Sequence, residues 1–411
     1  AALENEQNKT KDTTKIYSSY KNPIDEVIAS QNVILTVPYS IDEWKMPGHN
    51  LQNSISNVYL SGIDNRFLKK RIGKNKFSIS QVSSPPLYFD GNIIITDDVG
   101  SIYSVHRSGK KNWKKNIYKK VYKKIYKNLS TFIYKDKIFV ADNIGFIYSI
   151  NLSDGKLNWI KNHGVPIKSN IKVFDNKIFV VNQDNRLIAF NTQDGAKIWD
   201  VRSISTFIKS QYFLSLAITQ SGDIVMVTSS GDLVKVQGKN GTPYWSQNVT
   251  SVASTYSNDF FKSSDVLIDN NTIFFSTTSS IYSFNLMNGY LNWQKKVSSS
   301  RTPIINGNYI FIVSENGYFL CLDKKTGKII WSINTFKTLK QKKQNTTVTG
   351  FILGSGKMYI TTLNGFLIVC SANNGSIEYF KSVGDKITAP PIIVDASLYI
   401  LTEDSKILGY N

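Results

Sequence analysis

The residue types that most often perform chemistry are few in this 411-residue chain. The histidines are His49, His106 and His163, and because no His-x-x-x-His or Cys-x-x-Cys spacing occurs, the sequence predicts no metal site. It also contains no Gly-x-Ser-x-Gly elbow and no phosphate-binding glycine loop. The acidic pair Asp97-Asp98 stands where a β-turn is expected, and we interpret it as turn chemistry. We therefore expect no catalytic residues and no cofactor.

The two cysteines, Cys321 and Cys370, follow Gly317 and Gly365 by four and five residues in two similar apolar stretches. Since side chains alternate along a strand, the thiols should point to opposite faces. We expect two buried thiols and no disulfide, which leaves the redox compartment open. No run of about 18 apolar residues occurs, so no membrane-spanning helix is expected. The chain begins at Ala1 without a secretory signal, as a processed product would.

The elements that position these residues come from a repeat. Residues 316–331 contain a strand pattern, a polar turn that ends at Gly327, and a second strand that reaches Trp331. The same Gly-x-x-x-aromatic spacing recurs at Gly109/Trp113, Gly155/Trp159, Gly195/Trp199, Gly241/Trp245, Gly289/Trp293, Gly327/Trp331 and Gly375/Tyr379. The aromatic positions lie 46, 40, 46, 48, 38 and 48 residues apart. A β-type repeat with a period of about 40–50 residues is typical of a propeller or solenoid.

The last repeat is incomplete, because the chain ends at Asn411 without a Gly-x-x-x-Trp. Residues 65–73, which precede the first repeat, carry Phe67 at a suitable place to complete it. We therefore predict an all-β fold: an eight-bladed β-propeller of four-stranded blades, closed by an N-terminal strand that completes the C-terminal blade. Phe67 would take the role of the repeat tryptophans, which we interpret as packing residues.

Composition divides the chain into three parts. Residues 1–30 are polar and charged, which predicts a flexible tether. Residues 31–56 contain a short apolar run and Trp44, and we expect this lead-in segment to pack on the domain. Residues 57–411 form the single propeller domain.

The formal net charge of +19 fits an anionic partner or a surface coated with lysines. Because the lysines are spread over all repeats, we favour the coated surface. Residues 110–127 are the densest basic segment. Its residues Tyr118, Val121, Tyr122, Ile125 and Tyr126 recur at three and four positions, as in a helical stripe. We interpret the segment first as the connection between two blades, with an anionic membrane surface or nucleic acid as alternatives.

The connections after Trp199 and Trp245 differ from the others. Residues 204–213 are apolar for a loop, and residues 254–262 carry Asp259 beside two phenylalanines. Exposed apolar loops that also contain a basic residue suit a protein partner.

The repeat Gly-x-Leu-x-Ala/Ser-x-Asn/Asp-x-x-Thr/Asp-Gly-x-x-x-Trp resembles that of pyrroloquinoline-quinone-like propellers. The succession of segments 44–50, 229–233, 309–313, 321–323 and 389–391 resembles the BamB family of outer-membrane assembly lipoproteins in its alphaproteobacterial form. The resemblance covers about residues 31–411. It implies a non-enzymatic periplasmic scaffold without a cofactor, anchored to the outer membrane by lipid on an N-terminal Cys that this sequence does not contain.

The same resemblance implies partners. The family binds the POTRA domains of the barrel protein BamA together with other assembly-complex subunits, and it helps precursors of outer-membrane proteins to insert; no nucleic acid is expected. Its BamA-contacting loops follow the third and fourth blades, which here fall on Phe207, Ile208 and Lys209 and near Asp259. The second loop lacks the acidic–basic pattern of the family.

Two alternatives remain open. Quinone-dependent dehydrogenases share the repeat, but this chain lacks their adjacent-cysteine pair and a calcium carboxylate set. The other alternative is a propeller scaffold that acts at an anionic membrane surface.

Overall fold

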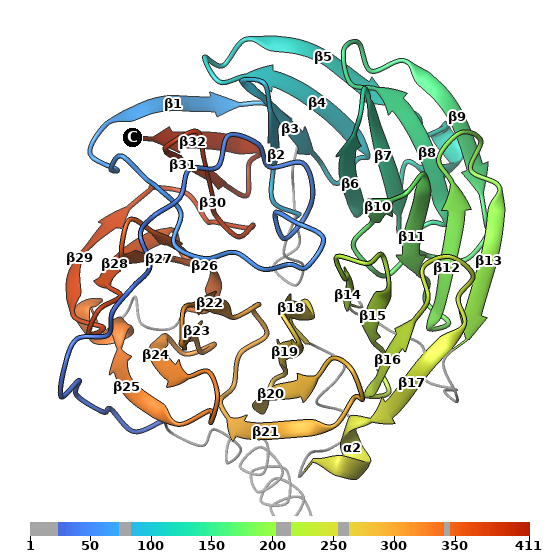
Figure 1. Cartoon of the computed structure of the whole chain (residues 1–411). Coiled ribbons are helices and arrows are strands. Elements are labelled where there is room, and N and C mark those ends of the chain that lie inside the picture. The colour runs from blue at the N-terminus through green and yellow to red at the C-terminus, as the bar shows by residue number, and fades with distance from the viewer. Residues whose placement is uncertain (1–23, 74–83, 203–214, 254–262, 341–345) are drawn as a thin grey trace, which may run out of the picture.

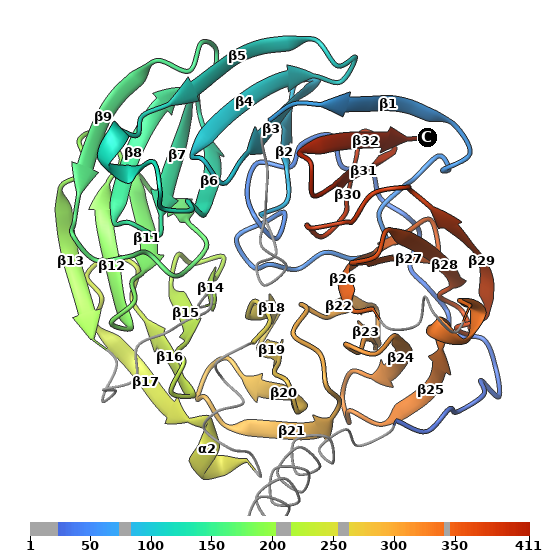
Figure 2. The same ribbon diagram turned by 180° about the vertical axis from the view of Figure 1, so that it is seen from behind.

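The computed structural model describes residues 24–73, 84–202, 215–253, 263–340 and 346–411. Within these residues, eight four-stranded antiparallel sheets stand around a ring, and Figures 1 and 2 show it from its two sides. The predicted eight-bladed propeller is confirmed.

Each blade has its strands in order from the channel to the rim (Figure 1). Blade one contains β2 (Leu87–Phe89), β3 (Asn92–Thr96), β4 (Ser101–His106) and β5 (Lys111–Asn116). Blade two contains β6 (Leu129–Tyr134), β7 (Lys137–Asp142), β8 (Phe146–Asn151) and β9 (Leu157–Asn162). Blade three contains β10 (Lys172–Phe174), β11 (Lys177–Val181), β12 (Arg186–Asn191) and β13 (Lys197–Arg202). Blade four contains β14 (Ser215–Ile218), β15 (Ile224–Val227), β16 (Asp232–Val236) and β17 (Pro243–Asn248).

The other four blades follow the same order. Blade five contains β18 (Leu267–Asp269), β19 (Thr272–Ser276), β20 (Ser280–Asn285) and β21 (Leu291–Lys296). Blade six contains β22 (Ile304–Asn306), β23 (Tyr309–Val313), β24 (Tyr318–Asp323) and β25 (Ile329–Asn334). Blade seven contains β26 (Val348–Gly354), β27 (Lys357–Thr362), β28 (Phe366–Ser371) and β29 (Ile377–Ser382). Blade eight contains β30 (Ile392–Val394), β31 (Ser397–Leu401), β32 (Lys406–Tyr410) and β1 (Arg66–Arg71).

Short helical turns occur where an outer strand leaves its blade. In the part of the chain that the structure describes, they are η1 (Lys120–Tyr122), α2 (Val249–Val252) and η3 (Thr335–Thr338). We call the side of the ring on which these connections start the connection face. The opposite side carries the turns with the repeat glycines.

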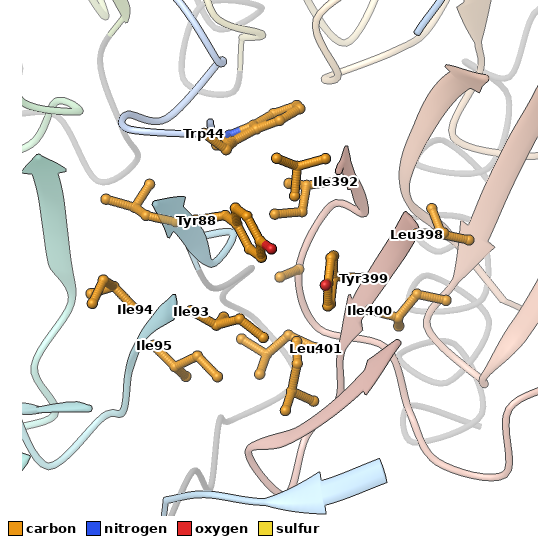
Figure 3. Close-up of a cluster of buried hydrophobic side chains, with 14 of the residues drawn as sticks. Trp44, Tyr88, Ile93, Ile94, Ile95, Ile392, Leu398, Tyr399, Ile400 and Leu401 are labelled. Atoms are coloured by element: carbon orange, nitrogen blue, oxygen red, sulfur yellow. The ribbon is translucent and has the colours of Figure 1, made fainter. Parts of the chain in front are cut away.

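The core lies between neighbouring blades, because the two middle strands of each blade are apolar on both faces. Figure 3 shows one such interface, where Tyr88 and Ile93 of blade one approach Tyr399 and Leu401 of blade eight. All four side chains are almost fully buried. A blade cannot cover these faces alone, which explains why the ring must close.

The Gly-x-x-x-Trp motif encodes a contact between blades. Gly155 has a φ of +69°, and a Cβ added there would lie 2.6 Å from Cε3 of Trp113 in the preceding blade. The indole N–H of Trp113 donates to the carbonyl oxygen of Leu152 in the same turn at 3.1 Å. The other repeat tryptophans also place their ring on the glycine of the next blade, in the pairs Trp159/Gly195, Trp199/Gly241, Trp245/Gly289, Trp293/Gly327 and Trp331/Gly375. Glycine is therefore required at this position for two reasons: its φ is positive, and the tryptophan ring leaves no room for a Cβ.

The predicted closure is confirmed, because β1 pairs antiparallel with β32. The residue at the tryptophan position is, however, Leu68 and not Phe67. Leu68 is opposite Gly409 and directly follows a bulge, and Trp113 likewise follows a bulge in β5. A Cβ added to Gly109 would lie 3.4 Å from Cδ1 of Leu68. Phe67 occupies the bulge and packs edge-on against Tyr399 at 5.9 Å. The bulge shifts the register by one residue, and the sequence does not reveal it.

Tyr379 of β29 is 41% exposed, and the described residues give it no turn glycine to pack on. Blade eight lacks such a turn because its outer strand comes from the other end of the chain. The expectation for the cysteines is confirmed: Cys321 and Cys370 are free and buried.

The described part of the expected tether, residues 24–30, lies along the outer edge of blade six. Val27 forms an antiparallel bridge with Ser332 of β25, with N–H to O distances of 3.0 and 2.9 Å. Glu26 accepts a hydrogen bond from the N–H of Asn334 at 2.8 Å and pairs with Lys337 at 2.9 Å. These residues therefore add a short fifth segment to this sheet.

Candidate functional site

The residues predicted to contact a protein partner lie outside the described residues. Phe207, Ile208 and Lys209 belong to 203–214, and Asp259 belongs to 254–262. The strands that flank these segments are described: β13 and β17 end, and β14 and β18 begin, on the connection face. The two connections thus join blade three to four and blade four to five.

The lead-in segment crosses the end of the central channel on the opposite face. Its backbone pairs with the innermost strands of successive blades, beginning with Trp44 and Tyr88 of β2, whose N–H and carbonyl groups are joined at 2.7 and 2.9 Å. Further backbone bonds connect Lys45 to Ile133, Leu51 to Ile218 and Gln52 to Ile268. The segment therefore ties blades one, two, four and five together at the channel.

Lys172 of β10 is the main side chain that holds this segment. Its Nζ donates to the carbonyl oxygens of Pro47 at 2.7 Å and Asn50 at 2.9 Å and to Oδ1 of Asn53 at 2.7 Å. The side chain is fully buried. Burial lowers the pKa of Lys172 to about 7, although the carboxylate of Asp265 acts in the opposite direction.

Asn53 completes the anchor. Its Nδ2 donates to the carbonyl oxygens of Leu216 at 3.0 Å and Val266 at 2.9 Å, so one side chain links blades three, four and five. His49, which has a φ of 70°, lies 4.9 Å from the ring of Trp44. Burial, and then the charge of Lys172, lower the pKa of His49 to about 4. The imidazole is therefore neutral at ordinary pH.

A cavity of about 250 Å³ remains in the channel above the lead-in segment. Asp265, Arg301 and Phe351 line it together with Trp44 and Asn53. Burial raises the pKa of Asp265 and lowers that of Arg301, whose Nη2 donates to the carbonyl oxygen of Val348 at 3.4 Å. The cavity is smaller than the roughly 300–1,000 Å³ of ordinary small-molecule sites.

Metal-binding side chains are not gathered in the part of the chain that the structure describes: no group of three or more His, Cys, Asp and Glu there could hold an ion. His106 is exposed, and His163 packs at 4.2 Å against Phe190. Asp97 accepts hydrogen bonds from the N–H of Ser101 at 2.8 Å and the hydroxyl of Tyr103 at 2.9 Å, as a turn residue does. Within the described ranges, the His, Cys, Asp and Glu side chains therefore do not fit a quinone site that depends on a metal ion.

The expected helical stripe in residues 110–127 is wrong. Residues 111–116 are the outer strand β5, and the only helical turn of this segment is the three-residue η1. Tyr118 and Tyr122 pack inward on Phe146, with ring centroids 6.1 and 5.4 Å apart. Residues 117–128 form the connection from β5 to β6, whereas residues 111–116 complete the sheet of blade one.

A model of the family described as outer membrane protein assembly factor BamB matches residues 98–333, more than half of the chain. The chain belongs to the BamB family. A BamB of Shewanella oneidensis is 23% identical over 281 residues, which cover 66% of this chain and 68% of the relative. A BamB of Moranella endobia is 21% identical over 308 residues, which cover 69% and 72%.

Solved structures share the fold of this BamB-family chain. The crystal structure of BamB from Moraxella catarrhalis aligns with a TM-score of 0.66 at 11% identity, over 84% of this chain and 99% of that one. A quinohemoprotein alcohol dehydrogenase from Comamonas testosteroni aligns with a TM-score of 0.70, also at 11% identity, over 90% and 80%. At such identities the likeness concerns the fold alone.

The sequence predicted that the lead-in segment with Trp44 packs on the domain, but it did not reveal the roles of Lys172 and Asn53. One signal for Lys172 was present, because it interrupts the apolar stretch of residues 171–174. A lysine in an innermost strand needs acceptors. Here the lead-in segment supplies them.

Proposed function

We propose that this BamB-family protein is a scaffold subunit of the machinery that assembles β-barrels in the outer membrane. The match of the family model to residues 98–333 carries this proposal, since it runs from the second turn of blade one to β25 of blade six. The proposed place of action is the periplasmic face of the outer membrane. No helix among the described residues has the length and apolar character needed to cross a membrane.

A scaffold role agrees with the way the ring is held. Eight blades share buried interfaces, β1 joins the two ends of the domain, and the lead-in segment spans the channel. Such a body changes shape little on binding and can present loops in a fixed arrangement. We propose that the protein positions its partners and performs no chemistry itself.

The proposed partner is the set of POTRA domains of BamA, together with other subunits of the complex and unfolded outer-membrane protein precursors. The proposed contact residues are Phe207, Ile208 and Lys209 in the connection from blade three to four, and Asp259 in the next connection. An apolar pair beside a cation can bury its aromatic ring in a partner while the charge fixes the orientation. Strand or loop addition would contribute backbone hydrogen bonds.

Co-purification of tagged protein with the POTRA domains tests this assignment. The triple variant Phe207→Ala, Ile208→Ala, Lys209→Glu is expected to lose most of the captured BamA, and Asp259→Lys to reduce it. Lys239→Glu, an exposed change in the turn before β17, serves as the matched charge control. Equal capture by the triple variant and the unchanged protein would remove these residues from the interface.

We further propose a lipid anchor on a Cys encoded upstream of Ala1. Reading the encoded segment before Ala1 for a signal peptide that ends in a lipobox and Cys tests this point. The dehydrogenase alternative is tested separately by adding pyrroloquinoline quinone and Ca²⁺ to the purified protein. We expect no absorbance of bound cofactor, because the channel cavity of about 250 Å³ is small and the lead-in segment forms part of its wall.

A further inference from the structure

The connection between blades one and two combines exposed lysines with exposed apolar side chains. Residues 110–127 contain nine lysines and no Asp or Glu. Lys119, Lys120, Lys123 and Lys124 are exposed, and none of them forms an ion pair with a described residue. The positive charge of this segment is therefore not neutralised by the protein around it.

Apolar side chains project from the same turn. Val121 is 75%, Ile125 45% and Tyr126 64% exposed. Exposing such side chains in water is unfavourable, by about 25 cal/mol for each Å² of apolar surface. Three of them beside four lysines form one surface, which we call the basic apolar patch: residues 119–121 and 123–126.

The patch stands on a fixed base. The hydroxyl of Tyr118 donates to Asp142, whose Oδ1 accepts from the N–H groups of Ile144, Gly145 and Phe146 at 2.8 to 2.9 Å. Asn143 donates to the carbonyl oxygen of Tyr126 at 2.8 Å. Lys127 also stabilises this turn, because its side chain is buried and donates to the carbonyl oxygen of Tyr122. The exposed side chains are thus presented by an ordered turn.

The base also decides which side chains are exposed. Tyr118 and Tyr122 are held against Phe146, so Val121, Ile125 and Tyr126 are left on the outside. The basic surface continues along the rim, where Lys111 and Lys114 of β5 and Lys69 and Lys70 of β1 are exposed on neighbouring blades.

We propose that the basic apolar patch docks on an anionic lipid surface, with the lysines at the headgroups and Val121, Ile125 and Tyr126 in the interfacial region. Lysine attracts anionic headgroups, and tyrosine is enriched at the level of the headgroups. Nucleic acid fits less well. Its bases need exposed aromatic rings, whereas two of the three local tyrosines are packed inward and the other exposed residues are aliphatic.

The patch lies between blades one and two, whereas the residues proposed to contact BamA follow blades three and four. Lipid docking therefore does not depend on the proposed partner. It would orient the ring on the membrane independently of a lipid anchor.

Flotation with vesicles tests the proposal. Vesicles of phosphatidylethanolamine with phosphatidylglycerol are expected to bind the protein, and vesicles of phosphatidylcholine alone are not. The quadruple variant Lys119→Gln, Lys120→Gln, Lys123→Gln, Lys124→Gln should bind about 600-fold more weakly, because each lysine contributes about fivefold. Val121→Ser with Ile125→Ser should weaken binding about tenfold. High salt should weaken binding of the unchanged protein, because exposed charges are screened.

A matched control removes the same charge elsewhere. Lys239, Lys296, Lys325 and Lys328 are exposed on blades four to six and form no ion pair with a described residue. Changing these four to Gln should leave vesicle binding nearly unchanged. If this control loses as much vesicle binding as the patch variant does, only the total charge matters. That result would overturn the proposal that the basic apolar patch is the docking site.

A fluorescent probe at Val121 in the basic apolar patch reports directly whether this residue enters the lipid. Val121→Cys can be labelled selectively, because Cys321 and Cys370 are buried. A polarity-sensitive dye there should shift to the blue on anionic vesicles, and a dye on Lys239→Cys should not. If the emission of the dye at this position does not shift, Val121 does not enter the lipid and the proposal is overturned. Tighter binding to a single-stranded oligonucleotide than to the vesicles, lost in the quadruple variant, would overturn the lipid assignment in favour of nucleic acid.

Discussion

The substitution Lys172→Met removes the ammonium group that holds the lead-in segment over the channel. Three acceptors then lose their donor: buried oxygens of Pro47 and Asn53, and a partly buried carbonyl oxygen of Asn50. Leaving a buried acceptor unsatisfied costs about 1–3 kcal/mol. The variant also avoids the burial of a charge, which for a pKa that falls from 10.5 to about 7 costs on the order of 5 kcal/mol. The two effects are of similar size, so the pH dependence is the sharper observable.

The sign of that dependence follows from the direction of the shift. At a pH below 7 the lysine is charged in the folded and the unfolded chain, and folding bears the whole cost of burying the charge. Between pH 7 and 10.5 the folded lysine is neutral while the unfolded one remains charged, so unfolding takes up a proton. The free energy of unfolding of the unchanged protein, minus that of Lys172→Met, should therefore rise by about 2 kcal/mol from pH 7 to 9.

Urea denaturation of both proteins at pH 7, 8 and 9 measures this difference. Lys239→Met, at an exposed site, controls for the loss of one lysine. Asp265→Asn removes the carboxylate that raises the pKa of Lys172, so it should move the rise to a lower pH. Limited proteolysis should cut the lead-in segment faster in Lys172→Met at pH 9. Parallel stability curves for Lys172→Met and the unchanged protein would refute the reasoning.

Three further predictions concern the anchor and the repeat. Because burial lowers the pKa of His49 to about 4, the protein should lose about 2 kcal/mol of stability between pH 6.5 and 4.5. His49→Asn, which tolerates the positive φ, should lose less over this range in urea titrations. Gly155→Ala should cost about 2–4 kcal/mol, because its Cβ would meet Trp113 and its φ is +69°. Gly164→Ala, with a φ of +73° and open space, isolates the backbone part, and an equal urea midpoint for both variants would refute the contact with the ring. Burial raises the pKa of Cys370 to about 12 and also raises that of Cys321, so neither thiol should react with Ellman's reagent at pH 8 until urea unfolds the chain.

The blades could be predicted from the sequence because the repeat contains the contact that joins them. A glycine with positive φ and an aromatic four residues later recur together, since each ring lies on the glycine of the next blade. Closure could be predicted for a related reason: the last repeat lacks its outer strand, and an open edge is avoided.

The sequence did not reveal features that depend on a shift of a single residue or on packing against a neighbouring blade. Phe67 looked like the missing aromatic, but the bulge in β1 gives that position to Leu68. In residues 110–127 the three- and four-residue spacing suggested one apolar side, whereas blade one takes residues 111–116 as a strand and directs Tyr118 and Tyr122 inward. The spacing of residues along the chain cannot show which blade a segment joins.

The sequence by itself determined the fold class, the number of blades and their closure, because these depend on local strand patterns and on a contact that repeats along the chain. Only the tertiary structure decided how the lead-in segment crosses the channel, that Lys172 and Asn53 hold it, and which apolar side chains of the basic apolar patch face outward. These features depend on residues more than a hundred positions apart, or on packing against a neighbouring blade. No periodic pattern records such contacts.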